Sequence, residues 1–414
     1  MVDIYQIGKM AKTASYEISS LDTKTKNAVL TKMAEDLIKN TSLIIKENEK
    51  DIQTAKQMGI KETMIDRLAL DEKRIKAMAD CIIQIAKVDD PIGITLSGCV
   101  RPNGLEIKKV TTSLGVVGII YESRPNVTAD AGALCFKAGN AVILKGGKEA
   151  VCSNKAIANS MRQTIKSFNL NENIINLIED TTRETTNKLM KMSEYIDVLI
   201  PRGGASLIKA VTQNSSIPVI ETGTGNCHIF VDYSANLQMA VDIIFNAKTS
   251  RPSVCNAAES MLIHKDIANK ILPLIKEKLD EKNVLIKGCE KSLKVLPNIE
   301  MATDEDYYTE FLDYIISLKI VEDIKEAVFH INKYGTGHSE VIVTQSHENA
   351  RYFTKNVDAA AVYVNASSRF TDGEEFGFGA EIGISTQKLH ARGPMGLKEL
   401  TTYKYIIEGD GQIR

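Results

Sequence analysis

Cys255 lies in the stretch TSRPSVCNAAES, residues 249–260, just after a turn that contains Pro252. A cysteine acts as a nucleophile in its thiolate form, which a nearby cation, a helix N-terminus or a base must favour. Arg251 stands four residues before it, and the segment NAAESM after it forms either a helix or a sharp loop whose Cys255 and Asn256 amides could donate to an oxyanion. Because most cysteines are small buried residues, composition alone leaves both interpretations open.

A second reactive candidate is Glu221, in IPVIETGTGNCHIFVD, residues 217–232. It ends an apolar run that predicts a strand, and two glycines follow it. A carboxylate at a strand end is suited to proton transfer. The alternative is a glutamate that caps a helix or forms an ion pair, and the segment itself does not decide between the two.

Two strand-like runs lead into paired glycines, in GNAVILKGGKEA (139–150) and IPRGGASLI (200–208). Lys145 and Lys148 in the first segment supply cations for a phosphate. Gly203 and Gly204 in the second precede a helix whose first N–H groups can face an anion. Each segment alone is typical of a tight turn, and together they favour a phosphate-bearing cofactor. Since the sequence has no G-x-G-x-x-G, a dinucleotide must be held differently.

Alternating strands and helices are expected to position these residues. Continuous β-branched runs separated by helical stretches predict parallel sheets covered on both faces. A first group of runs precedes a boundary near residues 221–224, a second group follows it, and helices such as 236–249, 265–281 and 347–356 lie between the later runs. The predicted strands are 116–121, 141–145, 173–178, 197–201 and 217–221, then 228–232, 259–264, 283–287, 339–344 and 360–365.

The two ends of the chain add further elements. Residues 1 to about 90 have helical periodicity and predict a surface helical layer. Residues 95–115 contain two strand-like arms around Asn103-Gly104, a strong hairpin signal. This hairpin is either an arm that reaches a neighbouring subunit or an ordinary surface hairpin. TTYKYII near the C-terminus predicts one more strand.

Composition excludes several classes of function. The 414 residues are 43% hydrophobic and 25% charged, and the net charge of −2 gives no field that would recruit nucleic acid or an anionic membrane. We find neither a signal peptide nor an apolar run of membrane-spanning length. Seven cysteines without a C-x-x-C pair predict reduced thiols in the cytoplasm, and six histidines without ligand spacing give no support for a metal site.

The motifs around Glu221, Cys255 and Lys145 resemble those of the aldehyde dehydrogenase superfamily. Within it, the whole chain is similar to the γ-glutamyl phosphate reductase family (glutamate-5-semialdehyde dehydrogenases). The segments that carry this resemblance are YESRPNVT (121–128), IPRGGASLI (200–208), ETGTGNCHIFVD (221–232), TSRPSVCNAAE (249–259), STQKLHARGPMGLKELTTYKY (385–405) and GDGQIR.

The resemblance implies NADPH-dependent reduction of L-glutamyl 5-phosphate to glutamate 5-semialdehyde, the second step of proline biosynthesis from glutamate. It makes Cys255 the nucleophile that forms a thioacyl enzyme. Lys145 would bind the adenosine ribose, and Lys148 would accept the 2′-phosphate where NAD-using relatives carry an acidic residue. Glu310 would bind the nicotinamide ribose.

Two further candidate residues lie in a segment that departs from the superfamily's usual pattern. The segment ESRPN replaces the superfamily's usual pattern, so Asn126 is a candidate oxyanion donor, and Arg124 either binds the substrate phosphate or forms a structural ion pair. Arg251 is a further candidate substrate ligand. FGFGAEIG (376–383), with Phe376 and Phe378, either lines the cleft near the cysteine or is a simple glycine-rich loop.

The implied fold is α/β and aldehyde dehydrogenase-like, with two parallel-sheet domains and a small β-hairpin oligomerisation arm. The NADPH-binding domain would comprise 1–95, 113–221 and 385–398, and the catalytic domain 222–384. The arm would comprise 96–112 and 399–414, in a homo-oligomer. The resemblance leaves open a transient association with glutamate 5-kinase.

Two other functions compete with this interpretation. A hydrolytic NAD(P)-dependent aldehyde dehydrogenase would use the same Glu221–Cys255 pair, with the glutamate activating water. In a reductase, hydrolysis of the thioester would destroy the intermediate before its reduction. We therefore expect Glu221 to poise Cys255 or to shape the site. A catalytically silent protein of this fold is the second alternative, and the presence of Cys255, Glu221 and Lys145 argues against it.

Overall fold

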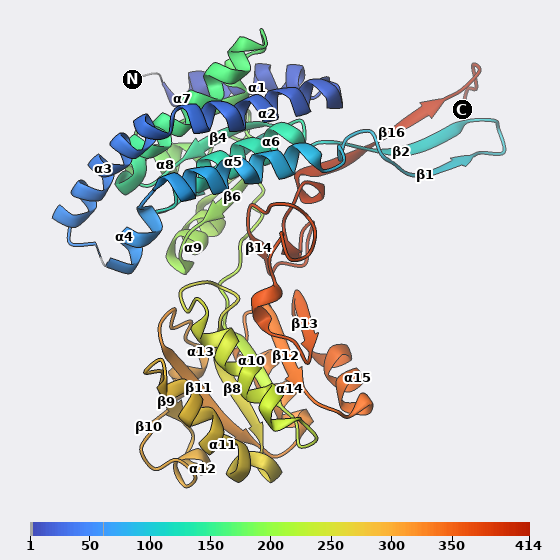
Figure 1. The fold of residues 1–414 in the computed structure, drawn as a ribbon. Coiled ribbons are helices and arrows are strands. Elements are labelled where there is room, and N and C mark those ends of the chain that lie inside the picture. Colours follow the sequence, from blue (N-terminus) through green and yellow to red (C-terminus); the bar gives the residue numbers. More distant parts are fainter. Residues whose placement is uncertain (1–2, 61) are drawn as a thin grey trace. The chain divides into compact units, whose positions relative to one another are not determined.

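The computed structural model describes residues 3–60 and 62–414 and has an α/β fold (Figure 1). Its backbone divides into two compact units. Unit 1 comprises Met1–Thr222, Gly377–Gly383 and Met395–Arg414, and unit 2 comprises Gly223–Phe376 and Ile384–Pro394. Residues Ile384–Pro394 thus cluster with unit 2, whereas the predicted cofactor domain included 385–398. Which unit holds a cofactor stays a prediction.

Unit 1 is built around a four-stranded parallel sheet in the order β5-β4-β3-β6. Its central strands, VVGIIY and AVILK, are buried at every residue, as expected for strands covered on both faces. Helices α1, α6 and α7 pack against these strands. The strands are β3 (Val116–Tyr121), β4 (Ala141–Lys145), β5 (Ile175–Leu177) and β6 (Val198–Arg202).

The predicted N-terminal helical layer is confirmed, with α2 and α5 packed together and α2 and α3 packed on α7. The helices of unit 1 are α1 (Ile4–Ile18), α2 (Thr23–Lys39), α3 (Thr41–Gln57), α4 (Glu62–Leu68), α5 (Glu72–Lys87), α6 (Asn126–Lys137), α7 (Val151–Ser167), α8 (Arg183–Leu189) and α9 (Ala205–Asn214). None of the described helices is long and apolar enough to span a membrane.

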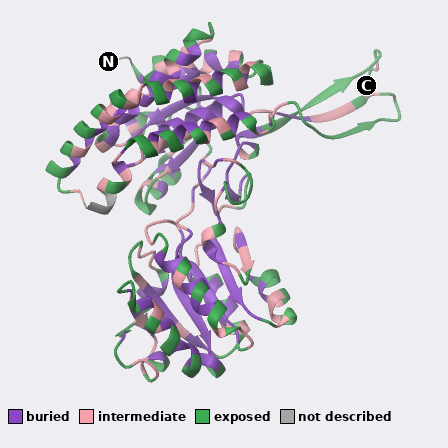
Figure 2. Ribbon diagram, in the orientation of Figure 1, coloured by how far each residue is buried: buried purple, intermediate pink, exposed green. Residues whose placement is uncertain are grey.

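The predicted hairpin is also confirmed. Strands β1 (Thr95–Val100) and β2 (Glu106–Ser113) pair antiparallel around a turn in which Gly104 has a φ of +88°. The C-terminal strand β16 (Thr401–Glu408) pairs with β2 along its whole length. This three-stranded sheet is largely exposed to solvent (Figure 2).

Unit 2 contains a seven-stranded parallel sheet in the order β10-β9-β11-β8-β7-β12-β13. Successive residues of its central strands face opposite sides, so that Ile229 packs with one hydrophobic core and Phe230 with the other. The strands are β7 (Cys227–Val231), β8 (Ala258–His264), β9 (Leu285–Gly288), β10 (Glu300–Met301), β11 (Ile315–Val321), β12 (Ser339–Val343) and β13 (Ala361–Val364).

Helices cover this sheet on both faces: α10 and α11 contribute to the first core, and α14 and α15 to the second. The helices are α10 (Leu237–Thr249), α11 (Lys265–Asp280), α12 (Glu290–Leu293), α13 (Asp304–Tyr308), α14 (Ile324–Tyr334) and α15 (His347–Asn356). The short strands β14 (Ile384–Ser385) and β15 (Gly393–Pro394) pair separately.

One prediction of secondary structure was wrong, and one strand was not predicted. The run at 217–221 forms only an isolated bridge between Val219 and Leu199, because Pro218 has no N–H to donate to a ladder. Strand β11 was not predicted, although it is an interior strand of the sheet in unit 2 and pairs with β9 and β8.

Candidate active site

Cys255 lies, half-buried, in the loop that connects α10 to β8. The loop turns sharply, with the Ala257 N–H donating to the Val254 carbonyl, and β8 begins at Ala258. The segment after the cysteine is therefore a turn that enters a strand, which decides between the loop and the helix left open by the sequence. The Cys227 thiol donates to the Cys255 carbonyl over 3.2 Å and fixes the backbone of the predicted nucleophile.

A buried ion pair joins the two ends of this loop. Lys248, near the end of α10, lies with its Nζ 2.6 Å from an oxygen of Glu259 at the start of β8, and both side chains are 0% exposed. Burial raises the pKa of the Glu259 carboxyl to about 7 and lowers the pKa of the Lys248 ammonium, while each group opposes the other's shift. We call this pair the loop clamp.

The loop clamp is connected to the segment that contains Glu310. The Leu312 N–H donates to Glu259 over 3.1 Å, and the Gly225 N–H donates to Glu310 over 2.7 Å. Gly225 in turn packs against the Cys255 carbonyl so closely that a Cβ would lie 1.4 Å from its oxygen. Predicted ligand Glu310 and predicted nucleophile Cys255 are thus brought together within unit 2.

Two arginines lie near the predicted nucleophile. The predicted ligand Arg251 is exposed on the loop, and Arg369 donates from its Nε to the Ser250 hydroxyl over 3.1 Å. Burial lowers the pKa of the Arg369 guanidinium; Arg251 adds to this, while Cys255 and Asp372 oppose it. Sequence reasoning missed Arg369, because its segment carries no motif and only tertiary contacts bring it to the loop.

In unit 1, the predicted cofactor residues lie at the carboxyl ends of the strands. Lys145 is the last residue of β4 and is 3% exposed, whereas Lys148 is exposed. Burial lowers the pKa of Lys145, and the nearby carboxylates of Asp180 and Glu149 oppose this. A buried ammonium at this edge of a parallel sheet fits a ribose or phosphate ligand. These two lysines would hold the cofactor's adenosine side.

Gly203 and Gly204 lie between β6 and α9, as predicted. In the structure, however, the Gly204 N–H donates to the Glu122 carboxylate over 3.1 Å, and a Cβ on Gly203 would lie 2.5 Å from an oxygen of the same carboxylate. The helix N-terminus therefore already faces an anion, which belongs to the chain itself.

A strained turn precedes Asn126. Ser123 has a φ of +44°, which is unusual for a residue with a side chain, and both its N–H and its hydroxyl donate to Glu149. The turn places Asn126 at the first position of α6, where its Nδ2 donates to Asp130 over 2.9 Å. Arg124 lies half-buried in the same turn.

The comparisons with known proteins cover almost all of the chain. The sequence profile described as the aldehyde dehydrogenase family matches residues 2–305. The chain belongs to the aldehyde dehydrogenase family. Among its relatives, the γ-glutamyl phosphate reductase of Caldanaerobacter subterraneus subsp. tengcongensis is 58% identical over 98% of both chains. That of Clostridium perfringens is likewise 58% identical over 98% of both.

Solved structures agree with this membership of the aldehyde dehydrogenase family. The crystal structure of γ-glutamyl phosphate reductase from Thermotoga maritima has a TM-score of 0.96 and 46% identity and covers 99% of both chains. An acetylating aldehyde dehydrogenase from Geobacillus thermoglucosidasius has a TM-score of 0.70 with 18% identity and covers 100% of both chains, which supports the fold.

The remaining site predictions of this aldehyde dehydrogenase lie on either side of the unit boundary. Glu221 is half-buried near the end of the first segment of unit 1, beyond the Val219 bridge. Phe378 is 39% exposed in unit 1, and Phe376 is 40% exposed at the end of a unit 2 segment. Their roles stay predictions.

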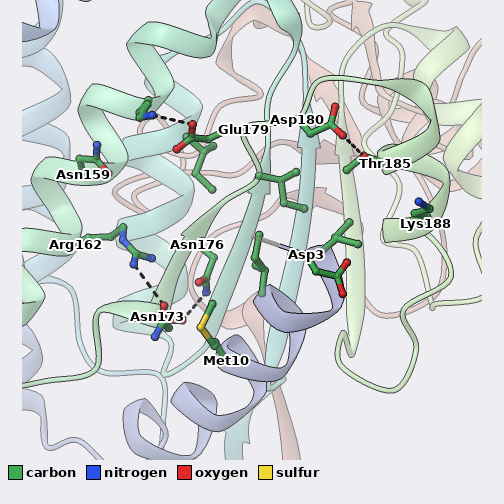
Figure 3. A pocket seen from close by; sticks show the side chains of 15 residues that line it. Asp3, Met10, Asn159, Arg162, Asn173, Asn176, Glu179, Asp180, Thr185 and Lys188 are labelled. Atoms are coloured by element: carbon green, nitrogen blue, oxygen red, sulfur yellow. Dashed lines mark hydrogen bonds and ion pairs between the residues drawn. The ribbon is translucent and has the colours of Figure 1, made fainter. Parts of the chain in front are cut away.

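A cavity of about 610 Å³ lies beside the edge strand β5 in unit 1 of this aldehyde dehydrogenase (Figure 3). Arg162 and the asparagines Asn173 and Asn176 line one part of it, and Asp180 and Thr185 line another. None of the predicted site residues is among its lining residues, so we do not assign the predicted chemistry to this cavity.

Asp130 provides a test of the environment around Asn126. Burial raises its carboxyl pKa from 3.8 to about 6, although the Asn126 amide and Cys81 oppose the shift. Between about pH 4 and 6 the folded state therefore binds more protons at this site than the unfolded state, and stability falls as pH rises through this window. We expect Asp130→Asn to raise the melting temperature at pH 8 and to have little effect near pH 4. Thermal melts at both pH values check this, and equal changes at the two would contradict it.

Proposed function

We propose that this protein reduces L-glutamyl 5-phosphate to L-glutamate 5-semialdehyde and phosphate with NADPH, as the second step of proline biosynthesis from glutamate. The observation that carries the proposal is the 58% identity over 98% of the chain to relatives named γ-glutamyl phosphate reductase. It is an oxidoreductase with a nicotinamide cofactor. The choice of NADPH over NADH is the finer part of the proposal and rests on Lys148.

The reaction begins at Cys255. Its thiolate attacks the acyl carbon, the new C–S bond forms, and the bond from that carbon to the phosphate oxygen breaks, so that phosphate leaves with the electron pair. NADPH, held by Lys145, Lys148 and Glu310, would supply a hydride to the thioester carbon. Cys255 then leaves as thiolate when the resulting thiohemiacetal collapses to the aldehyde. The Asn126 amide is our candidate donor to the carbonyl oxygen in both steps.

Deacylation by water must be avoided in this reaction. Glu221, which a hydrolytic enzyme would use to activate water, acts in our proposal by poising Cys255 or shaping the site. Glu221→Gln tests this role: if it abolished thioacyl hydrolysis and left phosphate-dependent turnover untouched, Glu221 would instead be a deacylating base.

The decisive experiment runs the reaction backwards, because an acyl phosphate decomposes quickly. Purified protein receives glutamate semialdehyde and NADP⁺, with and without phosphate, while absorbance reports NADPH. Reduction of NADP⁺ that requires phosphate supports the proposal. Phosphate-independent reduction would mean that water deacylates the enzyme and that it is a hydrolytic aldehyde dehydrogenase, and no reduction in either case would point to another substrate.

Lys148 is expected to determine the cofactor preference. It is exposed at the carboxyl end of the sheet and would bind the 2′-phosphate of NADP. We expect Lys148→Glu to raise the KM for NADP⁺ by roughly 10–100-fold, because a charge-assisted hydrogen bond is replaced by repulsion. The KM for NAD⁺ should change little. Steady-state kinetics with both cofactors measure this, with Lys270→Glu as a control of equal charge change on α11. An unchanged ratio of the two KM values would contradict the assignment.

The exposed three-stranded sheet is our proposed oligomerisation arm. Its apolar residues include Leu96, Val100, Tyr405 and Ile407, each more than half exposed. Apolar side chains that are left exposed on a small sheet are typical of a covered interface. We expect Tyr405→Asp with Ile407→Asp to shift the protein to a smaller species in sedimentation velocity while its melting curve stays cooperative. An unchanged sedimentation coefficient would contradict the arm's role.

The remaining parts of the proposal concern location and partners. We place the enzyme in the cytoplasm, where its seven reduced cysteines are stable. A transient association with glutamate 5-kinase would shorten the path of the unstable acyl phosphate. Co-sedimentation of the two proteins at micromolar concentration tests this association.

A further inference from the structure

We propose that Arg369, together with Arg251, binds the phosphate group of the acyl phosphate beside Cys255. This inference rests on the proposed function, since it assigns residues to the phosphate group, which an acyl phosphate has and an aldehyde lacks. The ligand is a phosphate monoanion or dianion, either as the leaving group of the acyl phosphate or as inorganic phosphate in the reverse reaction.

Arg369 is attached to the nucleophile loop on both sides of Cys255. On one side its Nε donates to the Ser250 hydroxyl over 3.1 Å. On the other side its carbonyl oxygen accepts from the Asn256 Nδ2 over 3.2 Å. Both partners border the segment that contains the predicted nucleophile, so Arg369 is held beside this loop by one contact of its guanidinium and one contact of its backbone.

The segment that carries Arg369 is itself fixed. The Ser368 hydroxyl donates to the Asn256 carbonyl over 2.6 Å, and the Asn256 Nδ2 also donates to the Thr371 carbonyl over 2.9 Å. The Thr371 hydroxyl lies 2.6 Å from that of Ser339, on β12. Ser368, Thr371 and Ser339 are 0% exposed. A guanidinium on such a base is preorganised for a ligand.

The positive charges of Arg251 and Arg369 favour an anion as the ligand beside Cys255. Arg251 and Arg369 are close enough to repel each other, and neither forms an ion pair with a carboxylate among the residues that the structure describes. The Cys255 thiol and Asp372 act in the other direction and raise the pKa of the Arg369 guanidinium. Two neighbouring guanidinium groups without an anion repel each other, and a phosphate that contacts both removes this repulsion.

This arrangement assists the first chemical step. As the Cys255 sulfur forms its bond to the acyl carbon, the phosphate oxygen that leaves gains an electron pair and thus negative charge. Guanidinium groups that contact this phosphate stabilise the transition state more than the ground state, which increases the rate. The same groups bind inorganic phosphate when the reaction runs backwards and the thioacyl enzyme is cleaved by phosphate.

Kinetics of the reverse reaction test the assignment. We expect Arg369→Gln to raise the KM for phosphate by roughly 10–100-fold, as removal of a charge-assisted hydrogen bond does, with the KM for NADP⁺ changed less than about 2-fold. Arg369→Lys should give an intermediate KM for phosphate, since an ammonium keeps the charge without the two-pronged geometry. Arg351→Gln, an exposed arginine on α15, is the control and should leave both KM values unchanged.

An unchanged KM for phosphate in Arg369→Gln would overturn the inference, including the case in which only kcat falls because the loop moves. A second measurement needs no turnover: phosphate should slow the alkylation of Cys255 by iodoacetamide in the wild type and lose this protection in Arg369→Gln. Persisting protection in the variant would equally overturn it. A wild type that needs no phosphate would instead refute the proposed function, so the two failures are distinguishable.

Discussion

Replacement of Cys255 by alanine is expected to abolish the phosphate-dependent reduction of NADP⁺, with a loss of kcat of at least about 10⁴-fold. The reason is that the second thiol at this loop, that of Cys227, is fully buried and has a pKa raised by burial, so it cannot replace the Cys255 thiolate. Removal of the nucleophile from an enzyme that works through an acyl intermediate costs on the order of 10⁶ in kcat. The measurement is NADPH absorbance under saturating phosphate, compared with the wild type at equal concentration.

Two controls make this result specific. Cys289→Ala removes another half-buried cysteine of unit 2 and should keep nearly full activity. Mass spectrometry should find an acyl group on the wild-type Cys255 peptide and none in Cys255→Ala. Activity within about 10-fold of the wild type in Cys255→Ala would show that the thioacyl mechanism is wrong.

Asn126→Ala has the second largest expected effect. Its side-chain amide lies at the first position of α6, and Asp130 accepts one of its two protons over 2.9 Å. In the proposed role the other proton would be donated to the developing oxyanion, and loss of one such donor costs roughly 10²–10³ in kcat. We therefore expect kcat to fall by this factor while the KM values change little, because the interaction strengthens in the transition state.

Steady-state kinetics again measure this effect, and Asn159→Ala is the matched control, since it removes an exposed asparagine from a helix of the same unit. A decrease of less than about 5-fold in kcat would assign the oxyanion to other donors. The backbone amides of Cys255 and Asn256 would then be the next candidates.

The parallel sheets could be predicted because their strands carry the signal in their own residues. Runs such as VVGIIY and AVILK are buried on both faces, and burial on both faces requires continuous apolar residues. The hairpin around Gly104 could be predicted for a similar local reason, since its turn requires a positive φ. At 217–221 the apolar pattern was the same, and the missing N–H of Pro218 outweighed it.

The contacts that hold the candidate site in place could not be predicted, since they depend on the tertiary structure. Lys248 and Glu259 are only eleven positions apart, yet both are ordinary charged residues until the fold buries them. Arg369 reaches Ser250 over more than a hundred residues, and nothing in its own segment indicates this. Motifs predict the nucleophile, whereas tertiary pairing determines what surrounds it.

The loop clamp has a practical consequence for protein engineering. Because Lys248 and Glu259 close the loop at its two stems, the residues between them form an insert with fixed ends. Libraries that vary 252–254 and keep both stems and Arg251 should retain the fold, so that new acyl substrates can be selected without redesign of the sheet. Gly225 must stay constant in such libraries, since any side chain there would collide with the Cys255 carbonyl.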